Sequence, residues 1–79
     1  MHLTVNKCRY IEEEESLHIY GETDNLRFDD VDALCGNVAA EWLDRHIGMR
    51  VKVNIIPDGD ERVLVLEDDD QVRLTILGL

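Results

Sequence analysis

The chain has 79 residues and a formal net charge of −10, from 18 acidic and eight basic side chains. This length predicts one domain spanning residues 1–79, and the 44% of apolar residues excludes a disordered chain. The charge argues against direct binding to DNA, RNA or an anionic membrane, which basic patches recognise, and favours a basic protein surface, a cation or high salt.

The first two predicted elements are strands joined by an acidic turn. Residues 2–10 alternate apolar and polar positions, but the alternation changes phase near Asn6 and Lys7, which predicts a β-bulge there. "IEEEES", residues 11–16, then places four glutamates in a row. We interpret this run as the turn of a hairpin whose second strand, residues 17–20, ends at Gly21.

A helix is predicted over "DDVDALCGNVAAEWLDRHIG", residues 29–48. Asp29 or Asp30 would be its N-cap, acids fill its first turn, and Gly48 would follow its last residue. At 100° per residue, one apolar stripe contains Val31, Leu34, Cys35, Val38, Ala39, Trp42 and His46.

Three further strands are expected at residues 50–56, 62–67 and 72–79, separated by the turns "PDGDE" and "EDDDQ". The resulting order is ββαβββ. One helix covers only one face of five strands, so the sequence predicts a two-layer α+β domain: an antiparallel five-stranded sheet with one helix packed on one face.

This topology would bring two acidic runs to the same end of the domain. One run comprises Glu12, Glu13, Glu14 and Glu15; the other comprises Glu67, Asp68, Asp69 and Asp70. Acids collect in turns because turns are solvated. Eight of them at one end would repel one another, which favours a site where a cationic partner meets them.

The uncovered face of the predicted sheet is a second candidate for a partner-binding surface. It would expose Tyr20, together with Leu64 and Leu66 from an inner strand. Stems of long neighbouring side chains could shield the two leucines. Alternatively, the apolar strip marks a contact surface for a partner or a second copy of the chain.

The sequence offers no pattern typical of a catalytic, metal or cofactor site. The acidic stretches lack the spacing of a calcium loop, the three histidines form no ligand pair, and there is no phosphate-binding glycine motif. Cys8 and Cys35 follow no metal or redox spacing and are expected to be reduced thiols. No signal peptide or transmembrane run is visible, so a cytoplasmic, non-enzymatic protein without metal or cofactor is expected.

In size and acidity the chain resembles phage-encoded anti-restriction and anti-CRISPR inhibitors, some of which imitate DNA. This resemblance concerns bulk properties and transfers no residue. It implies a small inhibitor or modulator that presents an acidic surface to the basic nucleic-acid-binding site of a partner, such as a nucleic-acid-processing complex. Two alternatives stay open: an interaction or dimerisation subunit that uses the open sheet face, and a halophilic domain whose acidity maintains solvation.

Overall fold

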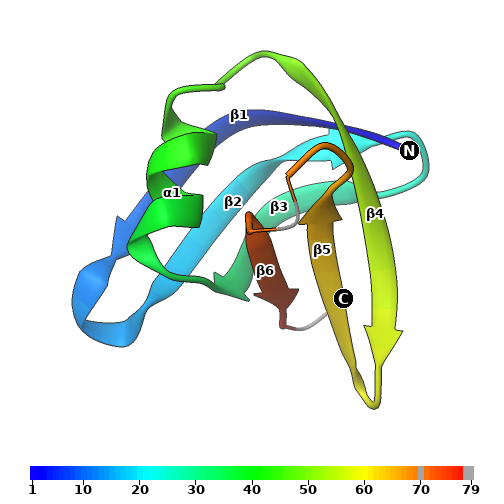
Figure 1. The fold of residues 1–79 in the computed structure, drawn as a ribbon. Helices are drawn as coiled ribbons and strands as arrows, with labels where there is room; N and C mark the ends of the chain where they lie inside the picture. Colours follow the sequence, from blue (N-terminus) through cyan, green and yellow to red (C-terminus); the bar gives the residue numbers. More distant parts are fainter. Residues whose placement is uncertain (70, 78–79) are drawn as a thin grey trace.

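Six antiparallel strands close into a barrel in the order β1–β2–β3–β6–β5–β4 (Figure 1). The computed structural model describes residues 1–69 and 71–77. The strands are β1 (His2–Ile11), β2 (Ser16–Thr23), β3 (Arg27–Leu34), β4 (Arg50–Asp58), β5 (Glu61–Leu66) and β6 (Arg73–Ile76), with a 3-10 turn η1 (Glu12–Glu14) and one helix, α1 (Asn37–Asp44). The predicted open five-stranded sheet with a helix on one face is therefore wrong.

The extra strand comes from the first part of the predicted helix. Residues 27–34 form β3, which pairs with β2 on one side and with β6 on the other, and α1 begins only at Asn37. The segment also alternates with period two, because Val31, Ala33 and Cys35 are more buried than Asp32 and Leu34 between them. The segment fits both a helix and a strand, and backbone hydrogen bonds to β2 and β6 stabilise the strand.

Most other strands lie close to their predicted positions, but β6 covers only Arg73–Ile76 of the strand predicted over residues 72–79, of which 78 and 79 lie outside the described residues. The bulge expected in β1 is confirmed, since the register between β1 and β2 shifts between Val5 and Lys7. The glutamate run forms the turn between β1 and β2, as predicted: η1 is followed by Glu15 in a left-handed conformation, with φ 49°. The backbone N–H of Glu15 donates to the carbonyl of Glu12 at 3.2 Å and closes the turn.

Barrel closure buries the Leu64 and Leu66 face of β5, which points into the core. Its residues 63–66 are all buried, and Leu64 and Leu66 are only 1% and 4% exposed. Both belong to the central core, together with Phe28 of β3 and Leu43 of α1. The uncovered sheet face on which these two leucines were predicted to be exposed does not exist.

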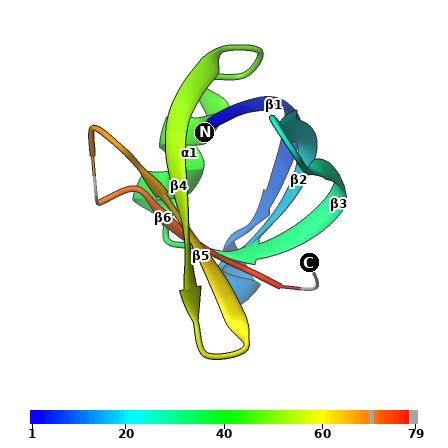
Figure 2. The same cartoon turned by 90° about the vertical axis from the view of Figure 1, so that its right-hand side faces the viewer.

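The two halves of the barrel curve toward each other. Figure 2 shows β1, β2 and β3 on one side and β4, β5 and β6 on the other. The halves join through short ladders in the described residues: β1 pairs with β4 at His2–Thr4, and β3 pairs with β6 at Ala33 and Leu34. Helix α1 lies in the connection from β3 to β4 and packs against β1 (Figure 1). In the described residues no helix has the length and apolar character needed to cross a bilayer.

Candidate functional site

The two acidic runs lie in different parts of the barrel. Glu12–Glu15 follows the end of β1, whereas the backbone N–H of Glu67 donates to the carbonyl of Lys52, which pairs with His2 at the start of β1. Figure 1 accordingly shows the β1–β2 turn at the lower left and the β5–β6 loop near the top of β5. The expectation that the runs share one end is wrong, because the barrel staggers its strands. Asp70 lies outside the described residues.

The other candidates are also separated. Tyr20 lies on the outer surface of β2, where the ammonium of its neighbour Lys7 is 5.4 Å from the centre of the tyrosine ring. Desolvation raises the pKa of Tyr20, and the nearby carboxylate of Asp30 raises it further. Leu64 and Leu66 are inside the core, so they are not available to a partner on the folded surface.

A histidine beside Tyr20 contacts two carboxylates. Nδ1 of His18 lies 2.9 Å from Oδ1 of Asp30 and 2.8 Å from Oδ1 of Asp32. Asp30 has a positive φ of 53° at a register shift between β2 and β3, and this bulge turns its side chain toward His18. Among the described residues this trio is the group whose donor atoms converge enough for a metal ion. Hydrogen bonding between the imidazole and the carboxylates accounts for the same arrangement without an ion.

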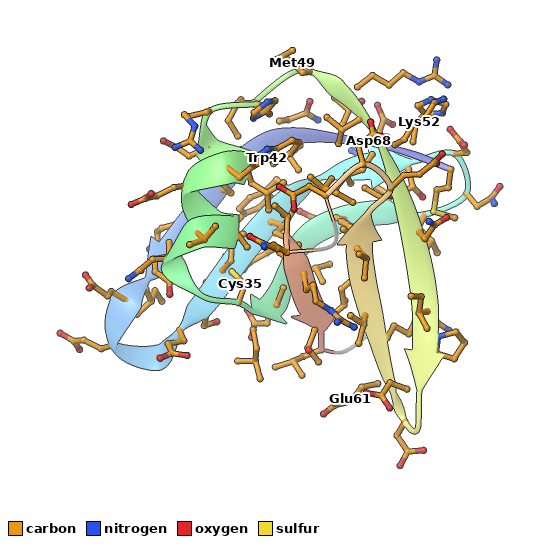
Figure 3. All side chains as sticks on the ribbon, in the orientation of Figure 1. Cys35, Trp42, Met49, Lys52, Glu61 and Asp68 are labelled. Atoms are coloured by element: carbon orange, nitrogen blue, oxygen red, sulfur yellow. The ribbon has the colours of Figure 1, made fainter. Side chains whose placement is uncertain are left out.

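One hollow is lined by Trp42, the single tryptophan of the chain. It has a volume of about 440 Å³ and lies between Trp42 of α1, the start of β4 and the β5–β6 loop (Figure 3). The ring of His46 stacks on Trp42 with centroids 3.7 Å apart. Its Nδ1 is 2.6 Å from the Trp42 carbonyl, which can only accept, so Nδ1 carries the hydrogen. Arg50 and Lys52 line this hollow together with Asp68 and Asp69, so its charge is mixed.

A smaller hollow between α1 and β1 carries charge of one sign only. We call it the acidic groove; it has a volume of about 290 Å³ and is lined by Cys8, Tyr10, Glu12, Leu17, Asn37, Ala40, Glu41 and Asp44. Leu17 and Ala40 are buried and form its apolar floor, while Glu12, Glu41 and Asp44 are exposed at its margin. No lysine or arginine is among these eight residues.

Two titratable groups in the acidic groove respond to its carboxylates. Desolvation raises the pKa of the Cys8 thiol, and the charge of Asp44 raises it further. Desolvation also raises the pKa of Tyr10, with additional contributions from Cys35, Glu15 and Glu12. The lining carboxylates lie from the β1–β2 turn to the end of α1, so the charge of the groove favours a cationic occupant.

Sequence reasoning identified only Glu12 among the residues of this groove as a partner-binding residue. Glu41 and Asp44 are three residues apart and thus share a helical face, which is a visible signal. That face lies opposite the apolar stripe of the predicted helix, and nothing in the linear sequence shows that β1 runs alongside it. The apolar floor was missed for the same reason, since Leu17 comes from β2 and Ala40 from α1.

Comparison of the chain with protein-family models, with curated proteins and with solved structures found no match. Inferences about function therefore rest on the residues and their geometry.

Proposed function

We propose that this protein is a non-enzymatic binding module that presents an acidic surface to a basic segment of a partner protein. A basic surface of this kind normally holds nucleic-acid phosphates, so occupying it would inhibit or modulate the partner. The observation that carries the proposal is the acidic groove, where three carboxylates border an apolar floor with no basic residue among the lining side chains. Such a site complements a side chain that is cationic at its end and apolar along its stem.

The acids outside the groove have a supporting part in this proposal. Glu13, Glu14 and Glu15 continue the acidic surface from Glu12 around the β1–β2 turn, and all are exposed. The net charge of −10 speeds the encounter with a basic partner by long-range attraction. Glu67, Asp68 and Asp69 form a separate acidic loop, where a partner covering both regions would make a second contact.

The environment of the cysteines supports a binding rather than a catalytic role. A nucleophilic cysteine needs a lowered pKa, because the thiolate is the reactive form. Burial instead raises the pKa of Cys8, and raises that of Cys35 to about 11. Both thiols consequently hold their protons at neutral pH.

The proposal is tested with a fluorescein-labelled dodecapeptide rich in arginine and lysine, using fluorescence anisotropy at 50, 150 and 500 mM salt. We expect saturable binding that weakens at least about tenfold over this range, since exposed charge pairs are screened. A glutamate-rich peptide of the same length is the control and should not bind.

Two results would refute the binding module. One is the absence of binding to the basic peptide at 50 mM salt; the other is affinity that does not change with salt. If the first result is accompanied by unfolding of the protein below molar salt, the acidity is a solvation adaptation instead.

A further inference from the structure

We infer that the acidic groove takes an arginine side chain of the partner, in preference to lysine. This inference rests on the proposed function and specifies the residue that its site recognises. Arginine and lysine share one charge, so the choice between them depends on shape, hydrogen-bond geometry and the surface beside the charge.

The carboxylates are placed to surround a branched, planar cation. Glu12 approaches from the β1–β2 turn, whereas Glu41 and Asp44 lie on one face of α1 across the groove. Within the described residues, no basic group lies within 4.0 Å of any of these three carboxylates in an ion pair. The five N–H donors of a guanidinium can bond carboxylates on two sides at once, whereas an ammonium is a compact point charge.

The floor of the acidic groove matches the rest of an arginine side chain. Leu17 is fully buried and Ala40 is 5% exposed, so they close the bottom of the groove, and the methylene stem would contact mainly the partly exposed Cys8 and Tyr10 beside them. The groove volume of about 290 Å³ is at the small end for ligand pockets, which suits one side chain rather than a larger ligand.

Tyr10 favours arginine further, because its ring lines the groove and is held in place. Its hydroxyl donates to the carbonyl of Cys35 at 3.1 Å. The backbone N–H of Cys35 in turn donates to the carbonyl of Glu15 at 3.0 Å, which ties the ring to the β1–β2 turn. A planar guanidinium can stack on an aromatic ring while the N–H groups at the guanidinium edge still bond carboxylates. An ammonium has no planar face with which to stack in this way.

Asp44 lies at an electrostatically unfavourable position in α1, although the C-cap Arg45 follows it. Asp44 is the last residue of α1, and the helix has no basic residue in its last turn. A carboxylate there faces the negative end of the helix dipole, where a cation is the stabilising choice. An arginine bound in the groove would add a positive charge beside this carboxylate.

The test uses two labelled peptides of equal charge, one with four arginines and one with lysine at those four positions. We expect the arginine peptide to bind the unmodified protein about fivefold more tightly, from stacking and bidentate hydrogen bonds. The paired substitution Glu41→Gln with Asp44→Asn should weaken its binding at least about tenfold.

The matched control is Asp60→Asn with Glu61→Gln, which removes the same two charges at the β4–β5 turn, far from α1 (Figure 3). This control should weaken binding by less than about twofold, because only the long-range attraction falls. Circular dichroism of both variants confirms that each is folded before binding is compared.

A second readout places the peptide in the acidic groove. Cys8 is partly exposed on its wall whereas Cys35 is buried, so the two thiols differ in access to iodoacetamide. We expect the arginine peptide to slow alkylation of Cys8, measured by mass spectrometry at pH 8.5.

The outcomes separate this inference from the proposed function. Salt-sensitive binding with equal affinity for both peptides, equal loss in the two paired variants and no protection of Cys8 would overturn the arginine site and leave the acidic binding module in place. Absence of binding by either peptide would overturn both.

Discussion

Replacing Leu64 tests whether the barrel is closed. Leu64 is 1% exposed and lies between Ile55 of β4 and Leu74 of β6. Leu64→Ala removes three carbon groups from the core, a loss of about 2.4 kcal/mol at about 0.8 kcal/mol per group, and the cavity left behind raises the total to about 2.7–5 kcal/mol. A domain of this length has a free energy of unfolding of about 4–12 kcal/mol, so the loss is a large fraction of it.

The measurement is urea denaturation, followed through the fluorescence of Trp42, the single tryptophan. Ile56→Ala is the matched control, since Ile56 lies on the neighbouring strand β4 but is 47% exposed. We expect this control to cost less than about 1 kcal/mol, because much of its side chain already contacts water. A cost below about 0.5 kcal/mol for Leu64→Ala would refute the closed barrel and restore an accessible face on β5.

Three further predictions concern single sites. Gly21→Ala should lower the free energy of unfolding by more than about 2 kcal/mol in urea titration, because the added carbon would lie 2.2 Å from the Thr4 carbonyl oxygen; unchanged stability would contradict this contact. Asp44→Asn should raise the free energy of unfolding by about 0.3–1 kcal/mol, since it relieves repulsion at the end of α1; a lower melting temperature would argue against that repulsion. Burial raises the pKa of Cys35 from 9.0 to about 11, with smaller contributions from the charges of Cys8 and Glu15. Between these two pH values the folded thiol keeps its proton, whereas the unfolded thiol loses it. The contribution of Cys35 to stability should therefore be constant below pH 9.0 and fall as pH rises to about 11, at no more than about 1.4 kcal/mol per pH unit; a Cys35→Ala variant whose stability falls equally steeply over this range would refute this assignment.

The strand predictions succeeded where local pattern and turn chemistry agreed. In β4, the alternation of Val51 and Val53 with Lys52, followed by the turn at Gly59, matches the observed strand and its hairpin. The change of phase in β1 likewise predicted a real bulge. Such signals involve residues close in the chain, so they can be read without knowing the fold.

The candidate site was harder to predict because its parts are far apart in the sequence. Tyr10 reaches the carbonyl of Cys35, 25 residues away, and the acidic groove combines β1 with α1. Glu12 was correctly recognised as an exposed turn residue, but its neighbours across the groove were not. Only the packing of α1 against β1 shows which of 18 acids face the same space.

The sequence by itself determined the acidic charge, the core-forming alternation in most strands and the turn made by the four glutamates. The tertiary structure alone decided that residues 27–34 are a strand and that Leu64 and Leu66 are buried. The physical reason is that residues 27–34 satisfy helical and strand periodicity alike, so their state depends on backbone hydrogen bonds to β2 and β6. Once that strand forms, the sheet can close. Closure determines which apolar side chains are inside the barrel and which acidic side chains border the same groove.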